Sequence, residues 1–405
     1  MTSVPSPTDQ PPAFSLKPLL AAACIGSMAM MAFVAVVGPM ARLLDLEPWH
    51  VGMAVTAAGV AWMLMARFWG AYSDRVGRRR VLLTALVGFA VSYAVLALFM
   101  NAALLWVPAA AITFLGMTLA RTAAGAFYAA VPPVCAAVVA DHTPPAGRAK
   151  AMGAVGAASA VGMVVGPGAA GLLAGWNIGA SLLVIAALPL VALVVVWRFL
   201  PADEHAAVRK PSPLKLTDPR LRRAVFTAFA AMFCVVAAQV VVGFVALDRL
   251  ALAPNDAARV SGVALAVVGV ALFVSQMVLR RLDWSPIRFI RIGGVVAAAG
   301  FACVNFADTP ALLWLTYGVA AAGMGWVYPA ISALAANSVE AHEQGAAAGA
   351  VGAAQGLAAV VGPIAGTLAY QASPGAPYVI GATLVLTAAL WPSRRPSPEQ
   401  TASVS

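Results

Sequence analysis

The feature that most limits the fold of this chain is a series of long apolar runs separated by short polar breaks. A helix needs about 20 apolar residues to cross the roughly 30 Å of hydrocarbon in a bilayer, and many of these runs are that long. Of the residues, 62% are apolar and 10% are charged, which is more apolar surface than a soluble core could bury. The sequence therefore predicts an all-α integral membrane protein and excludes a soluble enzyme.

We predict twelve transmembrane helices. The expected spans are 18–41, 51–72, 81–101, 108–138, 151–174, 179–198, 224–247, 258–279, 289–307, 310–336, 346–370 and 376–391. The stretch from 81 to 138 has no charge before Arg121 and only a weak turn signal at Asn101, but its length still predicts two helices.

The 25 Lys and Arg residues are distributed unevenly between the two sides of the membrane that these spans define. Most fall on the side of the N-terminus, whereas the opposite side holds only Arg42, Arg249 and Arg259. Such an excess marks the cytoplasmic side, so both termini are expected in the cytoplasm of a bacterial-type inner membrane. The formal net charge of +10 thus reflects topology and does not indicate a nucleic-acid partner.

An internal repeat divides the chain. Gly153–Ala158 recurs identically as Gly349–Ala354, and Val164–Pro167 recurs in the same register as Val360–Pro363. A parallel repeat in the membrane lets two halves rock about a site between them. The predicted parts are an N-terminal tail 1–17, a six-helix bundle 18–199, a cytoplasmic linker 200–223, a second six-helix bundle 224–392 and a C-terminal tail 393–405.

A motif with a carboxylate, two glycines and a basic cluster follows the second span, from Gly70 to Arg80. It resembles the hallmark of the Major Facilitator Superfamily, and a turn that only obeys the charge rule would not explain Asp74. The resemblance implies a latch in which Asp74 meets the start of the eleventh span and an arginine. The latch residues it implies are Gly70, Asp74, Arg75, Gly77, Arg78 and Asp141.

The fifth span carries glycines around a proline. Glycines four apart allow close helix contact, and proline bends a helix, so packing alone is one interpretation. The pattern also resembles the antiporter motif of the twelve-span drug/proton exporters, with Ala170 in place of one glycine. Its recurrence in the eleventh span favours the exporter interpretation. The motif residues are Gly162, Gly166, Pro167 and Gly171, with Gly362 and Pro363 in the repeat.

Arg121 lies inside the fourth span, four residues before Gly125. This pair resembles the superfamily's arginine motif, with Ala124 where a glutamine is usual, and the resemblance implies a role in proton coupling. An arginine within the bilayer is a functional candidate because its charge is costly to bury. The alternative is an arginine satisfied by neighbouring backbone carbonyls.

All fifteen acidic residues fall in predicted loops or at helix ends. A cavity without a carboxylate disfavours cationic cargo, so we expect neutral or anionic cargo. Polar and aromatic residues within spans are candidates for its lining, although they also serve as helix contacts or interface anchors. The candidates are Tyr128, Ser159, Gln239, Gln276, Tyr317, Trp326, Tyr328 and Gln355.

Together with the expected cargo, the resemblance implies a monomeric, proton-driven exporter of an amphiphile such as a siderophore, a secreted metabolite or an antibiotic. An importer or uniporter of an organic anion is the alternative. A membrane-embedded enzyme is disfavoured because all four histidines are expected in loops and no span pairs a nucleophile with a base. Neither a metal site nor a cofactor is predicted.

Overall fold

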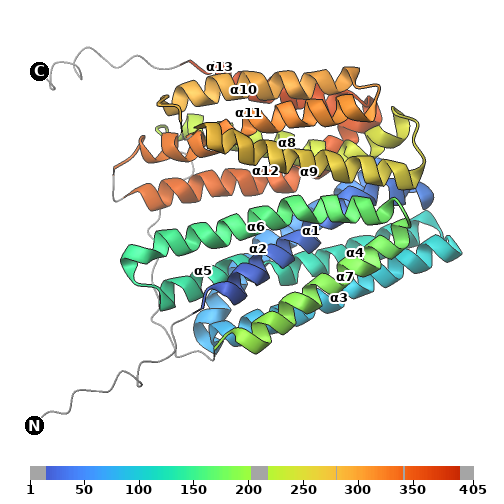
Figure 1. Ribbon diagram of the computed structural model, residues 1–405, viewed down its shortest axis with the longest axis horizontal. Coiled ribbons are helices and arrows are strands. Elements are labelled where there is room, and N and C mark those ends of the chain that lie inside the picture. The colour runs from blue at the N-terminus through green and yellow to red at the C-terminus, as the bar shows by residue number, and fades with distance from the viewer. Residues whose placement is uncertain (1–14, 202–217, 280, 341–342, 393–405) are drawn as a thin grey trace, which may run out of the picture. The chain divides into compact units, whose positions relative to one another are not determined.

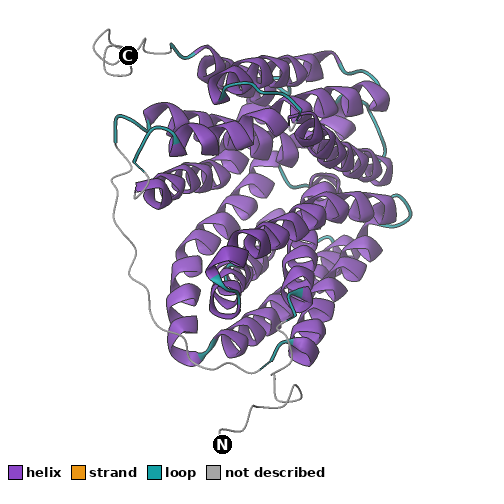
Figure 2. Cartoon of the chain, turned by 60° about the vertical axis from the view of Figure 1, so that its left-hand side comes forward, coloured by secondary structure: helices purple, strands orange, loops and turns teal. Residues whose placement is uncertain are grey.

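A computed structural model describes residues 15–201, 218–279, 281–340 and 343–392 of the chain. These residues form helices joined by short loops, with no strand among them (Figure 2). Eleven helical segments in the described part are long and apolar enough to cross a membrane, and a twelfth, α13, is apolar but shorter. The predicted all-helical membrane fold is confirmed. Most of the predicted linker and tails lies outside the described residues.

The helices follow the expected spans closely. They are α1 (Lys17–Leu43), α2 (Pro48–Val76), α3 (Arg78–Trp106), α4 (Ala110–Tyr128), α5 (Val131–His142), α6 (Pro145–Ala174), α7 (Ile178–Phe199), α8 (Arg222–Asp248), α9 (Pro254–Leu279), α10 (Pro286–Cys303), the short 3-10 helix η2 (Val304–Phe306), α11 (Pro310–Ala336), α12 (Gln344–Ala372) and α13 (Ala376–Leu390).

Glycine and proline set several of these boundaries. Gly77 joins α2 to α3 at φ 104°, a conformation that favours glycine because it has no Cβ. The span expected at 108–138 is interrupted between α4 and α5, which together cover Ala110–His142. Pro132 and Pro133 cannot donate to the preceding turn, and this explains the interruption.

The chain packs as two compact units. The first contains α1 to α7 together with Gln239–Gly269 and Pro363–Pro374, which are parts of α8, α9 and α12. Within it, α1 lies against α6 and α7, and α3 lies against α4 and α7 (Figure 1). The second unit contains the remaining segments, and there α10 packs against α11 and α13. The predicted division at the repeat boundary stays a prediction.

The contact between α1 and α6 depends on glycine. A Cβ at Gly162 would overlap the backbone of Cys24, and one at Gly166 would overlap the carbonyl of Met28. Helices in lipid gain little from hydrophobic burial against each other, so close van der Waals contact stabilises them instead. Gly153, on the same helix, faces open space, since a Cβ added there would meet no atom within 4 Å.

We expect Gly166→Ala to destabilise the protein by about 1–3 kcal/mol, because the added methyl must push α6 away from α1. Gly153→Ala is the matched control, and it should be neutral or slightly stabilising because alanine favours helix by roughly 1 kcal/mol over glycine. Thermal unfolding of the detergent-solubilised protein measures both. Equal melting temperatures for the two variants would contradict the contact.

Candidate transport site

One charged cluster joins the ends of α2 and α5 to the start of α3. The Arg78 guanidinium pairs with Asp74 and donates from Nε to Asp141 at 3.2 Å. It also donates to the Ser73 hydroxyl at 2.7 Å, and its side chain is only 12% exposed. An arginine shared by two carboxylates leaves a net negative cluster that is well supplied with hydrogen bonds.

The other residues of the predicted latch are placed around this cluster. Gly77 has a positive φ and turns the chain between α2 and α3, where Arg78 is the first residue of α3. The Gly70 carbonyl accepts a hydrogen bond from the Ser73 hydroxyl at 2.8 Å. A Cβ at Gly70 would meet only Pro133 at 3.9 Å, so packing does not require glycine there. Arg75 is exposed. The start of α12 belongs to the second unit, so its approach by Asp74 stays a prediction.

The start of α12 has a carboxylate of its own. Glu343 accepts two hydrogen bonds of 2.9 Å from Arg220, whose guanidinium also binds Asp218 at 2.8 Å. Hydrogen bonds from Arg220 hold the pKa of the Asp218 carboxyl below its usual value. This cluster was not predicted from the sequence, because Arg220 lies among other basic residues that are all typical of a linker.

Arg121 is the most deeply buried charge in the described chain, at 2% exposure. Its Nη2 donates to the Met30 carbonyl at 3.0 Å, its Nη1 contacts the Met30 sulfur at 3.2 Å, and its guanidinium lies 4.8 Å from the Phe33 ring centre. The buried Nε has no hydrogen-bond partner. None of these partners carries a negative charge, so the charge of Arg121 is only partly compensated.

Two tyrosines place further polar groups on the same stretch of α1. Tyr93 of α3 donates to the Ala29 carbonyl at 2.6 Å, and the Tyr128 hydroxyl lies 2.8 Å from that of Ser27. Tyr128 was predicted from the sequence, whereas Tyr93 was not, because it sits in an apolar run without any motif. Gly125 has a packing role, since a Cβ there would lie 2.6 Å from the Ala58 carbonyl of α2.

The glycines of the fifth span face two different helices. Gly162 and Gly166 meet α1, whereas Gly171 meets α9, where its Cβ would lie 2.6 Å from Gly262. The Pro167 carbonyl lies against Gly262 as well. In the second unit Gly362 has only ordinary contact with Val236 at 3.4 Å, so the repeated sequence does not repeat the tight packing.

The remaining cavity candidates are divided between the units. Ser159 and Gln239 are half-buried in the first unit, whereas Gln355 is half-buried and Gln276 exposed in the second. The other three are engaged with backbone carbonyls: Tyr317 with Ala238 at 2.8 Å, Trp326 with Ser275 at 2.9 Å and Tyr328 with Ala231 at 3.5 Å. Their shared lining of one cavity stays a prediction.

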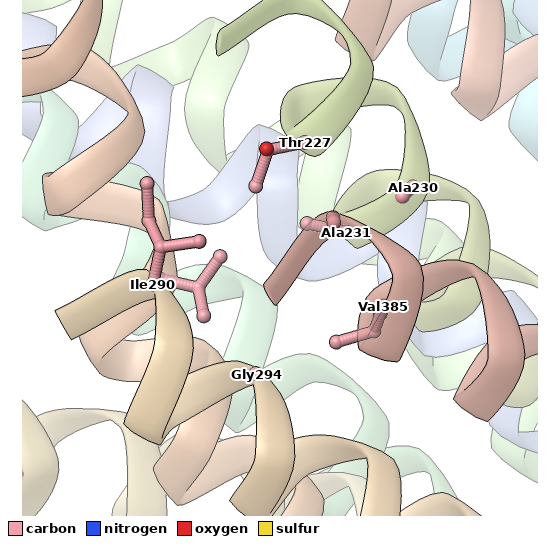
Figure 3. A pocket seen from close by; sticks show the side chains of 8 residues that line it. Thr227, Ala230, Ala231, Ile290, Gly294 and Val385 are labelled. Carbon is pink, nitrogen blue, oxygen red and sulfur yellow. The ribbon is translucent and has the colours of Figure 1, made fainter. Parts of the chain in front are cut away.

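A small recess in the second unit is apolar. It is lined by Thr227, Ala230, Ala231, Ile290, Gly294, Val327, Val385 and Ala388 (Figure 3). Its one hydroxyl, that of Thr227, already donates to the Arg223 carbonyl at 2.8 Å. Without further polar groups to orient a ligand, this recess is a packing feature of α8, α10, α11 and α13.

The prediction that all four histidines lie in loops is wrong for two of them. His50 lies in the first turn of α2, where its Nδ1 accepts from the Glu47 amide at 2.9 Å, and His142 is the last residue of α5. Both lie at helix ends, and the boundaries of a helix predicted from periodicity are uncertain by several residues. The described residues hold no group of three His, Cys, Asp or Glu side chains placed to bind a metal.

Comparison with known proteins identifies the family of this architecture. The model of the Major Facilitator Superfamily matches residues 19–363 and 259–404. The chain is 31% identical over 358 residues to the class C tetracycline resistance protein of Escherichia coli, covering 83% of this chain and 85% of that protein. It is 28% identical over 361 residues to the class G protein of Vibrio anguillarum, covering 83% and 86%.

Solved structures share the fold at low identity. A bacterial homologue of the human lysosomal transporter Spinster, in an inward-facing and occupied conformation, superposes with a TM-score of 0.71 at 14% identity, covering 93% of each chain. The nucleoside transporter NupG gives 0.68 at 14% identity, covering 93% of this chain and 98% of its own. The protein is therefore a multi-pass membrane transporter rather than an enzyme, and it belongs to the Major Facilitator Superfamily.

Proposed function

We propose that this transporter is a proton-coupled exporter of a neutral or anionic amphiphilic small molecule. The observation that carries the proposal is Arg121, a buried guanidinium whose partners are all uncharged. Kinship with tetracycline resistance proteins supports outward transport of an antibiotic-like compound. A siderophore or a secreted metabolite that is neutral or anionic and amphiphilic belongs to the same proposed cargo class.

The charge of Arg121 argues for the cargo class. A buried arginine without a carboxylate makes its surroundings positive, which repels a cation and attracts an anion or the carbonyl and hydroxyl groups of a neutral molecule. A cation would need a compensating acid, and the acidic residues of the described spans lie at helix ends, as Asp74, Asp248 and Asp256 do.

In the proposed cycle, the ion pairs of Arg78 with Asp74 and Asp141 form in one conformation of the transporter and break in another. Arg78 links three helices at the end of α2, so separating these carboxylates from Arg78 would leave charges unpaired. Such a cluster holds one arrangement until another set of contacts replaces it. In this proposal it stabilises the closed inner side during alternating access.

The topology and surroundings complete the proposal. Both termini lie in the cytoplasm, in keeping with the distribution of Lys and Arg, and the protein works as a monomer in a bacterial inner membrane. Protons moving inward drive the cargo outward. Proton coupling rests on the antiporter motif and on the kinship with drug-efflux proteins, since no acid lies in the middle of a described span.

The proposed cargo class and direction are tested with inside-out membrane vesicles that contain the protein. Acidifying the vesicle interior should drive uptake of tetracycline or of neutral and anionic fluorescent amphiphiles, and a proton-exchanging ionophore should abolish it. Ethidium, a cation, should not accumulate. Ethidium uptake at a similar rate would contradict the cargo class, and uptake only into right-side-out vesicles would favour the alternative importer of an organic anion.

We expect Asp74→Asn to lower transport by roughly tenfold or more, because loss of a charge-assisted hydrogen bond of about 1.5–3 kcal/mol changes a rate by that factor. Arg80→Ala is the control, since Arg80 is an exposed residue in the first turn of α3 that lies outside the cluster of Asp74, Arg78 and Asp141. Both variants should insert and elute as a single species. Normal transport by Asp74→Asn would refute the role of the latch.

Arg121→Ala should reduce transport of an anionic probe by roughly tenfold or more, with a smaller effect on a neutral probe, since it removes the charge and its hydrogen bond of about 1.5–3 kcal/mol. Tyr93→Phe removes a neighbouring hydrogen bond to α1 without changing the charge, and transport should stay near normal. If both variants lose anion and neutral transport equally, Arg121 serves only to position α1.

A further inference from the structure

A second polar network lies in the first unit at the end opposite the Asp74 cluster. Arg42, at the end of α1, donates to Asp248, at the end of α8, at 2.6 Å. Tyr370 of α12 donates to the same oxygen, Oδ2 of Asp248, at 2.9 Å. The new network lies beside the start of α2, whereas Asp74 lies near the end of that helix. The 29 residues of α2 span about 40 Å at 1.5 Å per residue, so the two networks are at opposite ends of α2.

Aromatic contacts fix the geometry of this network. The Arg42 guanidinium lies 5.7 Å from the centre of the Phe244 ring, one turn before Asp248, and that ring lies 5.9 Å from the ring of Tyr370. Gln371 adds a hydrogen bond of 3.2 Å to Glu47, the residue before α2. Side chains thus tie α1 and the start of α2 to α8 and α12, which come from distant parts of the sequence.

The backbones below this network are in close contact. A Cβ at Gly243 of α8 would lie 2.7 Å from Pro39 of α1, and a Cβ at Gly52 of α2 would lie 2.8 Å from the Pro363 carbonyl of α12. These contacts join helices of the first half of the chain to helices of the second half. The polar network therefore lies beside closely packed helix backbones.

The ion pair itself is partly exposed, with 38% of the Arg42 side chain and 33% of the Asp248 side chain accessible. Exposed pairs are weak individually, so this network can break and reform during a cycle. A conformational latch needs contacts that are specific in geometry and modest in energy, because it must release on each turnover. The shared acceptor, Asp248, makes the network depend on one carboxylate.

We propose that Asp248 is a positioning residue of the transport cycle, which holds α1 and α12 against α8 and keeps the side opposite the N-terminus closed until cargo is released there. The proposal rests on the proposed alternating access. Asp248 acts through Arg42 and Tyr370 and need not touch the cargo.

The test measures closure directly. Ala246 is fully buried on α8, just before Asp248, and Ala246→Cys is introduced after Cys24, Cys135, Cys234 and Cys303 have been replaced by serine or alanine. Labelling by a membrane-impermeant maleimide, added to the side opposite the N-terminus, reports opening. We expect Asp248→Asn to raise the labelling rate at least fivefold, and Tyr370→Phe to raise it less, because its ring contact with Phe244 remains.

The control is a second ion pair predicted on the same side. Arg259 pairs with Asp256 at 3.2 Å within α9, so Asp256→Asn breaks a pair that ties no other helix and should leave labelling unchanged. Exchanging the charges, Arg42→Asp with Asp248→Arg, should bring labelling back towards the starting rate. Unchanged labelling in Asp248→Asn, or an equal rise in Asp256→Asn, would overturn the proposal.

The labelling assay needs no cargo and therefore separates two failures. If Asp248→Asn raises labelling while the unsubstituted protein shows no proton-driven efflux, the latch stands and the proposed function fails. If efflux is present and labelling does not respond, the latch fails and the proposed function stands.

Discussion

Close backbone contact between helices is the constraint on which the rest of this structure depends. Hydrocarbon removes the hydrophobic gain that holds helices together in water, so packing and a few polar contacts must supply the stabilisation. Gly162 and Gly166 let α6 reach the backbone of α1, and Gly171 lets the same helix reach α9. One glycine-rich helix thus serves both as a fixed contact inside its own half and as a contact to a helix of the other half.

Charges are distributed in a way that fits this packing. The networks of Asp74 and Asp248 both lie at helix ends. Exposure lowers the cost of breaking the pair of Arg42 and Asp248, whereas Arg78 is only 12% exposed. Arg121 lies between the ends, buried, and its partners are the Met30 backbone and sulfur and the Phe33 ring. The contacts proposed to change between states therefore lie at helix ends, whereas the buried charge of Arg121 is held away from those ends by α1.

Much of the fold could be predicted from the sequence because length and hydropathy determine a membrane span almost alone. The cluster of Asp74, Arg78 and Asp141 was found by its motif, and its contacts agree with that grouping. Tyr93 and Asp248 could not be found this way. Their roles depend on which helix faces they meet, and that information is not present in local periodicity. The turn before Val131 was missed for a related reason, since hydropathy continues through it.

The start of α12 has a carboxylate beside it that the resemblance to the superfamily does not imply. The resemblance predicts that Asp74 supplies the carboxylate for this helix end. Glu343 directly precedes α12 and is bound by Arg220, so a negative charge already stands where the positive end of the helix favours one. Arg220 binds both Asp218 and Glu343, so one guanidinium is shared by two carboxylates beside this helix end, as Arg78 is shared by Asp74 and Asp141 in the first unit.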